Sequence, residues 1–203
     1  MKSSCLAWVL CLGESKKVVI VGIAGVGKTT LVSKIVEILN NKKKSVSVHS
    51  FGTVMFEEAK KLGIASRDEL RKLPVEKQRN LQKIAAKKIS GFDHNVVIID
   101  THAFIATNEG FYPGLPYPVL EELKPANLIT VSARPEEIYN RRMKDTTRER
   151  DIISIENIKK ELAVQEAMVS SCAVLIGAPM KSVLNTEGNI EEAANEVINA
   201  IGL

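Results

Sequence analysis

A length of 203 residues suits one α/β domain with a full hydrophobic core, or one domain carrying a small insert. Hydrophobic residues make up 45% and charged residues 26% of the chain, values that are ordinary for a globular protein and argue against a disordered chain or a membrane protein. The net charge of +4 is mild, and the basic residues are spread out apart from one cluster, so we expect neither a nucleic acid nor a membrane as partner. The three cysteines form no C-x-x-C pair, so we expect no zinc site and a reducing, cytoplasmic location.

The first sixteen residues differ from the rest of the chain. A single lysine precedes an apolar stretch from Cys5 to Leu12, which is at the lower limit for a signal-peptide core and too short to span a bilayer. We expect residues 1–16 to form a leader outside the fold and residues 17–203 to form the domain.

A strand pattern runs directly into a glycine-rich motif. The expected strand Lys17–Gly22 is followed by G-x-x-x-x-G-K-T and then by an expected helix over Lys28–Asn41. In this context the motif is typical of a phosphate-binding loop, because the glycines let backbone amides converge on an anion at a helix N-terminus. We predict that Lys28 reaches the β- and γ-phosphates of a nucleoside triphosphate and that the Thr29 hydroxyl binds Mg²⁺. The predicted triphosphate site comprises Gly22, Ile23, Ala24, Gly25, Val26, Gly27, Lys28, Thr29 and Thr30.

Strands and helices then alternate along the chain. Further strands are expected at Ser45–Ser50, Asn95–Asp100, Leu128–Ser132 and Lys181–Asn185. Helices are expected up to about Phe92, with breaks near Gly63 and at Pro74, and then over Pro135–Met143, Ser154–Gly177 and Glu191–Ile201, whereas residues 108–118 read as a loop. This alternation predicts an α/β fold with a five-stranded, parallel, doubly wound sheet.

Asp100 ends the second continuous apolar strand. The carboxyl ends of parallel strands share one edge of the sheet, so this carboxylate should face the phosphate loop. We expect it to hold Mg²⁺ directly or through a water molecule. The alternative is an aspartate that only caps the turn after the strand.

A basic cluster follows the helix expected at Pro135–Met143. Four arginines and a lysine lie between residues 141 and 150, interrupted by Asp145-Thr-Thr. Arginine suits planar, bidentate phosphate recognition, and a short arginine-bearing segment between helices is typical of a lid that covers the phosphates. We expect the lid at about 141–153; an exposed, solvated helix face is the alternative reading. The predicted catalytic residues are Lys28, Arg141, Arg142, Arg148 and Arg150.

A third group of residues could form a pocket for a second nucleotide. Arginines would bind its phosphate, while threonine, glutamine and backbone groups would bind its base. The candidates are Gly52, Thr53, Arg67, Arg71, Gln82, His102 and Gly114. Arg67 and Arg71 could instead pair with neighbouring acids. The surplus of arginines, beside one well-placed acid, favours a phosphate rather than a hydroxyl as acceptor, because an ionised phosphate needs no base.

These motifs together resemble the archaeal-type adenylate kinase. The resemblance rests on the phosphate loop, F-G-T-V-M-F-E at 51–57, R-D-E-L-R-K-L at 67–73, I-D-T-H at 99–102, Y-P-G-L-P at 112–116 and D-T-T-R-x-R-D at 145–151. It covers the chain from about Lys17 to Leu203. It implies the reaction ATP + AMP ⇌ 2 ADP with Mg²⁺, which maintains the adenine nucleotide balance, a nucleoside-monophosphate-binding (NMP-binding) region at about 51–92, and a cytoplasmic homotrimer. It also implies that Arg71 contacts the AMP phosphate and that the lid arginines reach the phosphates.

Two other functions remain open at this point. One is a kinase for another nucleoside monophosphate, such as CMP or UMP, since only base contacts separate these enzymes. The other is an adenylate-kinase-like ATPase that acts on a macromolecular partner. A GTPase switch is disfavoured because no N-K-x-D motif occurs, and an ABC-type L-S-G-G-Q signature is absent as well.

Overall fold

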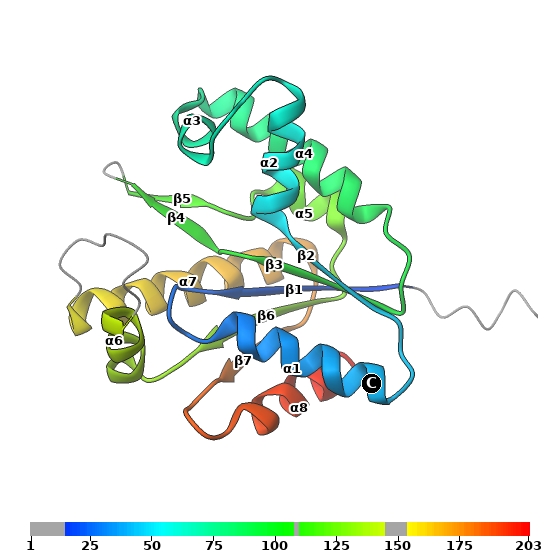
Figure 1. Cartoon of the computed structure of the whole chain (residues 1–203), viewed down its shortest axis with the longest axis vertical. Helices are drawn as coiled ribbons and strands as arrows, with labels where there is room; N and C mark the ends of the chain where they lie inside the picture. The colour runs from blue at the N-terminus through cyan, green and yellow to red at the C-terminus, as the bar shows by residue number, and fades with distance from the viewer. Residues whose placement is uncertain (1–14, 108–109, 145–153) are drawn as a thin grey trace, which may run out of the picture.

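The computed structural model describes residues 15–107, 110–144 and 154–203 (Figure 1). Its centre is a five-stranded sheet in the order β2-β3-β1-β6-β7, in which all neighbouring strands are parallel. The strands are β1 (Lys16–Gly22), β2 (Val46–Ser50), β3 (Val96–Thr101), β6 (Asn127–Ser132) and β7 (Met180–Leu184). All five predicted strands and their parallel arrangement are confirmed.

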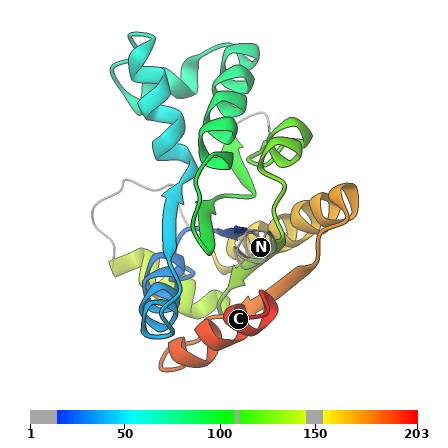
Figure 2. The same ribbon diagram turned by 90° about the vertical axis from the view of Figure 1, so that its right-hand side faces the viewer.

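Helices cover both faces of the sheet (Figures 1 and 2). On one face lie α1 (Lys28–Asn41) and α8 (Ile190–Ala200), which pack against each other. On the other face α5 (Tyr117–Leu123) packs against both α4 (Val75–Ser90) and α7 (Ile155–Ile176). The strand β1 shows why two layers form, because Val18 and Ile20 join the core on the α1 side while Val19 and Val21 join the opposite core.

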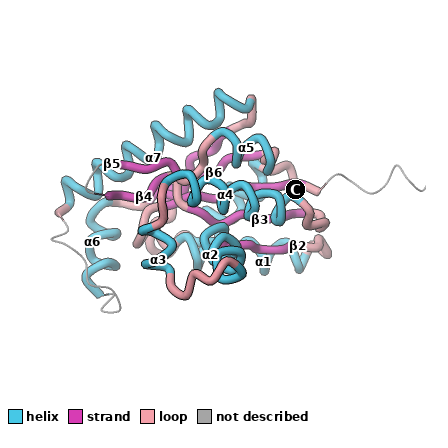
Figure 3. The backbone as a smooth tube through the Cα atoms, turned by 90° about the horizontal axis from the view of Figure 1, so that it is seen from above, coloured by secondary structure: helices cyan, strands magenta, loops and turns pink. Residues whose placement is uncertain are grey.

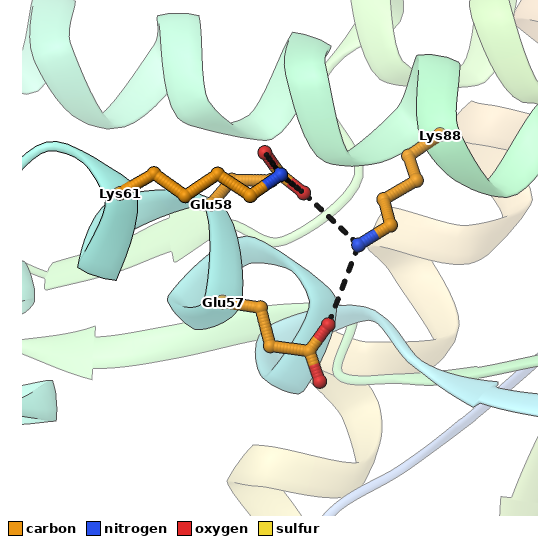
Figure 4. A network of polar contacts seen from close by, with 4 residues as sticks. All are labelled: Glu57, Glu58, Lys61 and Lys88. Atoms are coloured by element: carbon orange, nitrogen blue, oxygen red, sulfur yellow. Dashed lines mark hydrogen bonds and ion pairs between the residues drawn. The ribbon is translucent and has the colours of Figure 1, made fainter.

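A helical region rises from the sheet between β2 and β3. It consists of α2 (Phe51–Lys61), α3 (Arg67–Lys72) and α4, and the predicted breaks near Gly63 and at Pro74 separate these helices. The buried Glu58 carboxylate on α2 accepts hydrogen bonds from Lys61, at 2.7 Å, and from Lys88 on α4, at 3.0 Å (Figure 4). This ion network joins α2 to α4 in the region predicted to bind the nucleoside monophosphate.

The loop expected at 108–118 is in part regular structure. β4 (Phe104–Thr107) and β5 (Gly110–Pro113) form an antiparallel hairpin, and α5 begins at Tyr117. The hairpin extends past the sheet on the side where α6 (Pro135–Lys144) lies (Figures 1 and 3). The expectation was wrong because glycine and proline in so short a segment hide the strand pattern, while pairing between the two strands and the contact of Phe104 with Phe111 (ring centroids 4.7 Å apart) stabilise it.

The boundary expected after residue 16 also needs a small correction. Lys16 belongs to β1: its N–H donates to the Asn95 carbonyl at 3.0 Å and its ammonium to the Ile201 carbonyl at 2.8 Å. Residues 1–14 of the expected leader lie outside the described residues. Among the described helices, none combines the length and the apolar character that a membrane crossing requires.

Candidate active site

The phosphate loop connects β1 to α1 at the centre of the sheet. Gly25 and Gly27 both have positive φ angles, +88° and +81°, and the N–H of Leu31 donates to the Gly27 carbonyl at 3.0 Å to begin the helix. A Cβ atom at Gly27 would lie 2.5 Å from the Asn185 amide nitrogen, so this position accepts only glycine. The predicted strand–loop–helix arrangement of a phosphate-binding loop is therefore present.

Lys28 and Asp100 meet at the carboxyl edge of the sheet. The buried Lys28 ammonium forms an ion pair with the Asp100 carboxylate and donates to the Thr101 carbonyl at 2.8 Å. Burial lowers the pKa of the Lys28 ammonium, and the charge of Asp100 and the hydrogen bond to it oppose that shift. The two residues, which come from α1 and β3, thus place a positive and a negative charge next to the loop, as the strand order predicted.

The oxygen donors near the loop suit Mg²⁺. The Thr29 hydroxyl belongs to an exposed residue at the start of α1, and the Asp100 side chain is 27% exposed. Within residues 15–107, 110–144 and 154–203 there is no cluster of three or more His, Cys, Asp and Glu residues that could hold a metal. Mg²⁺ does not need such a cluster, because it is usually held by one or two protein oxygens together with substrate phosphates and water. The role of Thr29 and Asp100 as metal ligands stays a prediction.

Side chains from other elements contact the carbonyl groups of the loop. His102 Nδ1 lies 3.0 Å from the Gly22 carbonyl, and Arg142 Nε donates to the Ala24 carbonyl at 2.7 Å. Arg141 donates to the Gly25 carbonyl at 3.3 Å, and Asn185 donates to the Val26 carbonyl at 2.8 Å. The backbone of the loop is thus held from outside at four positions by residues distant in sequence.

The predicted lid arginines have different environments. Arg141 on α6 is partly exposed and also pairs with Glu137 at 3.3 Å. Arg142 is buried and forms an ion pair with Glu161 on α7 at 2.6 Å. Arg148 and Arg150 lie outside the described residues, as does most of the segment 141–153 predicted as the lid. The contacts of all four with phosphates stay predictions.

Three of the predicted acceptor residues lie together at the start of α2. Arg67 donates to the Thr53 hydroxyl at 3.1 Å, and a Cβ atom at Gly52 would lie 3.8 Å from the Arg67 guanidinium. Ser50, which precedes α2, is the register partner of Asp100, so this cluster lies at the same edge of the sheet as Lys28. The contact of Arg67 with the phosphate of an acceptor nucleotide stays a prediction.

The other predicted acceptor residues are more scattered. Arg71 is exposed and pairs with Asp68 at 3.0 Å, which was the alternative expected for it. Gln82 lies on α4, half-buried. His102 and Gly114 lie together beside the loop, because a side chain at Gly114 would overlap the His102 carbonyl and the Gly114 N–H donates to Ala103 at 2.8 Å.

The structure adds site residues that sequence reasoning missed. Asn185 follows β7 at the same edge of the sheet as Asp100, so the rule that singled out Asp100 could also have found it. Glu161 lies within the long helix α7, and no motif in the neighbouring sequence marks it as a site residue.

A cavity of about 390 Å³ next to Arg141 is lined by Glu137, Asn140, Arg141, Met143, Lys144 and Glu187.

Comparisons with known proteins agree with this geometry. A family described as "AAA domain" matches residues 21–159. The adenylate kinase of Methanocaldococcus jannaschii is 42% identical over 190 residues, covering 93% of this chain and 99% of that protein. The adenylate kinase of Sulfurisphaera tokodaii is 45% identical over 192 residues, covering 90% of this chain and 97% of that protein.

Solved structures of other kinases share the fold at low sequence identity. Shikimate kinase from Acinetobacter baumannii in complex with shikimate is 16% identical with a TM-score of 0.55, covering 92% of this chain and 93% of that one. Shikimate kinase from Bacteroides thetaiotaomicron is also 16% identical, with a TM-score of 0.56 and coverage of 93% and 99%. The structural likeness, at 16% identity, shows only a shared fold. The sequence identity of 42–45% to the two archaeal adenylate kinases extends over at least 90% of the chain and shows the family. The chain belongs to the adenylate kinase family.

Proposed function

We propose that this protein is a nucleoside-monophosphate kinase that catalyses ATP + AMP ⇌ 2 ADP. The observation that carries the proposal is the buried Lys28, paired with Asp100 beside a phosphate-binding loop, in a chain that is similar to adenylate kinases over nearly its full length. The reaction keeps the adenine nucleotides in balance.

The donor nucleotide binds at the loop. The amides of the loop and the α1 N-terminus bind the β- and γ-phosphates, and Lys28 turns its ammonium from Asp100 toward them. The Thr29 hydroxyl and the Asp100 carboxylate would hold Mg²⁺, and the ion would neutralise part of the phosphate charge. Arg141 lines the cavity and also donates to the Gly25 carbonyl, so the cavity is next to the loop, and the nucleoside part of ATP binds there.

The acceptor binds on the other side of Asp100. Gly52 and Thr53 at the start of α2 and Arg67 at the start of α3 bind AMP, together with Arg71, Gln82, His102 and Gly114. An oxygen of the AMP phosphate attacks the γ-phosphorus of ATP, and the bond from that phosphorus to the β–γ bridging oxygen breaks. Two ADP molecules result. The attacking oxygen is already ionised, so these residues align the two phosphates and neutralise charge rather than remove a proton. Arg141, Arg148 and Arg150 supply further positive charge.

The assembly and location follow from the family resemblance. The protein is a cytoplasmic homotrimer whose substrates are nucleotides, without a nucleic acid or a membrane as partner. Light scattering on the purified protein after size-exclusion chromatography measures the number of chains in the assembly. A mass different from that of three chains contradicts the homotrimer.

A substrate panel tests the proposed reaction. Purified protein is mixed with Mg²⁺, ATP and one of AMP, CMP, UMP or GMP, and ADP formation is measured against a control without acceptor. The expected result is rapid ADP formation with AMP. Preference for CMP or UMP would make the protein another monophosphate kinase, and equal ADP formation without acceptor would make it an ATPase.

A further inference from the structure

Three successive carbonyl groups of the phosphate loop are held by side chains from outside it. The carbonyls of Ala24, Gly25 and Val26 accept hydrogen bonds from Arg142, Arg141 and Asn185, respectively. The C=O of one residue and the N–H of the next belong to one planar trans peptide unit and point in opposite directions. A donor that holds a carbonyl on the outside of the loop therefore also aims the following amide toward the inside.

Two of these peptide units matter most for an anion. The Ala24 carbonyl is paired with the Gly25 amide and the Val26 carbonyl with the Gly27 amide, whereas the Val26 amide donates within the loop to the Ile23 carbonyl at 3.4 Å. Gly25 and Gly27 have positive φ angles and no side chains, so the backbone at these two positions rotates at low cost. The orientation of their amides thus depends on external contacts.

Asn185 is fixed against the loop on both sides. The residue is 5% exposed. Its side-chain amide donates to the Val26 carbonyl at 2.8 Å, and its backbone N–H donates to the Ser132 carbonyl at the end of β6, also at 2.8 Å. The amide therefore joins the loop to the ends of β6 and β7. An amide in this position can hold one carbonyl outward without carrying a charge into the site.

Arg142 is fixed in the same way by an acid. The buried guanidinium donates through Nε to the Ala24 carbonyl at 2.7 Å and through Nη2 to Glu161 at 2.6 Å. Glu161 is linked to the loop through Arg142. Because these donors are engaged behind the loop, the guanidinium serves the backbone there rather than a phosphate in front of it.

We propose that Asn185, and Arg142 held by Glu161, are positioning residues that keep the Gly27 and Gly25 amides aimed at the triphosphate. The proposal rests on the proposed function in that it assigns the loop to ATP. It predicts a loss of affinity for Mg·ATP when either support is removed, because a loop that must be reordered on binding binds more weakly than a preformed one. The AMP site does not use these contacts.

The first experiment compares two buried asparagines. Asn127 is also buried, at 8% exposed, and its amide donates to a backbone carbonyl, that of Ala200, at 3.1 Å, but it lies at the opposite end of β6. Asn185→Leu and Asn127→Leu remove the same kind of bond without adding charge. The dissociation constant for Mg·ATP is measured by calorimetry without AMP, together with Tm and the KM for AMP.

The expected outcomes separate positioning from general destabilisation. Both variants lower Tm, but Asn185→Leu raises the Kd for Mg·ATP by about tenfold or more and leaves the KM for AMP within about twofold, whereas Asn127→Leu leaves both constants unchanged. An unchanged Kd in Asn185→Leu, or an equal rise in Asn127→Leu, overturns the proposal. A wild-type protein that does not bind Mg·ATP at all overturns the proposed function instead.

The second experiment uses the direction of the change in ATP affinity when a charge is removed. It can be done even if the Asn185→Leu variant fails to fold. Glu161→Gln removes a negative charge near an anionic ligand, so electrostatics alone predicts tighter ATP binding, whereas a positioning role predicts weaker binding. Glu166→Gln on the same helix is the control, because its carboxylate accepts from Thr130 at 3.1 Å. The proposal requires a Kd for Mg·ATP that is several-fold higher in Glu161→Gln and unchanged in Glu166→Gln. Tighter or unchanged binding of Mg·ATP by Glu161→Gln contradicts the role of the Arg142–Glu161 pair.

Discussion

The side chain of Lys28 combines burial with a nearby opposite charge. Burial lowers its pKa, and the charge of Asp100 and the hydrogen bond to it oppose that shift. An enclosed positive charge acts strongly on a phosphoryl group in transfer, because little water screens it.

Lys28→Met should therefore lower kcat/KM by about 10² to 10³ with little loss of stability, since the partly exposed Asp100 carboxylate can be hydrated in the variant. The coupled ADP assay and a thermal melt measure the two effects. Lys34→Met is the control on the same helix, where Lys34 pairs with Glu37 at 3.0 Å. Near-normal turnover in Lys28→Met would exclude the assigned role.

A second residue, His49 on β2, links stability to pH. Its ring stacks on Phe92 with centroids 3.9 Å apart, and burial, followed by repulsion from His94, lowers its pKa from the ordinary 6.5. As the pH falls below 6.5, the unfolded chain takes up this proton before the folded one does. The folded state is therefore favoured above pH 6.5 and loses stability between 6.5 and the lowered pKa.

His49→Phe should keep the stacked ring and remove this part of the pH dependence. We expect the free energy of unfolding by urea to rise less between pH 5 and pH 7 in the variant than in the wild type, a range that includes the ordinary pKa of 6.5. Identical slopes in the two proteins would show that His49 does not titrate differently in the folded state.

At the scale of elements, the ion network of Glu58 holds two helices of the NMP-binding region together (Figure 4). Hydrogen bonds from Lys61, and then from Lys88, hold the pKa of the Glu58 carboxyl below its ordinary 4.5. Because the pKa is lower in the folded than in the unfolded chain, the ionised carboxyl stabilises the folded state. This stabilisation is fully present above pH 4.5 and is lost as the pH falls through the lowered pKa. The contact between α2 and α4 is thus strongest near neutral pH.

Glu58→Gln should lower Tm at pH 7. The difference from the wild type should shrink as the pH falls from 4.5 through the lowered pKa, where the wild-type carboxyl also becomes neutral. Thermal unfolding at several pH values tests this. Glu57→Gln is the matched control, because the exposed Glu57 makes only a 3.4 Å contact with Lys88. A difference in Tm that does not vary with pH would place the effect of Glu58 in packing instead of charge.

At the scale of the whole molecule, the sheet couples two hydrophobic cores. Leu128 and Ile129 are neighbours on β6, both fully buried, but Leu128 belongs to the core on the α4–α5 side and Ile129 to the core on the α1–α8 side. Because β1, β3 and β6 each contribute buried residues to both cores, neither layer can lose its packing without exposing the shared sheet.

Leu128→Ala and Ile129→Ala should each lower the free energy of unfolding by about 2–5 kcal/mol, in a single transition with the same denaturant slope as the wild type. Denaturation by urea, followed by fluorescence and circular dichroism, checks both points. Ile84→Ala, at a site 39% exposed, should cost far less. Two separated transitions in either core variant would show that the layers unfold independently.

The amino-acid sequence by itself determined the five strands of the parallel sheet, most helices and the phosphate loop. These features depend on short-range patterns: Val96–Ile99 reads as a buried strand because four consecutive apolar residues suit a sheet covered on both faces, and the glycines before Lys28 permit a loop that other residues cannot adopt. Asp100 could be assigned to the site because the rule for parallel strands places every carboxyl end at one edge.

Only the tertiary structure decided what supports that loop. Arg142 contacts Ala24 across 118 residues of chain and Asn185 contacts Val26 across 159, and no local pattern marks either pair. The sequence placed Arg142 among residues that face phosphate, while folding surrounds its guanidinium with the Ala24 carbonyl and Glu161. The physical reason is that hydrogen-bond partners of a buried polar group depend on which elements pack together, and that is a property of the whole fold.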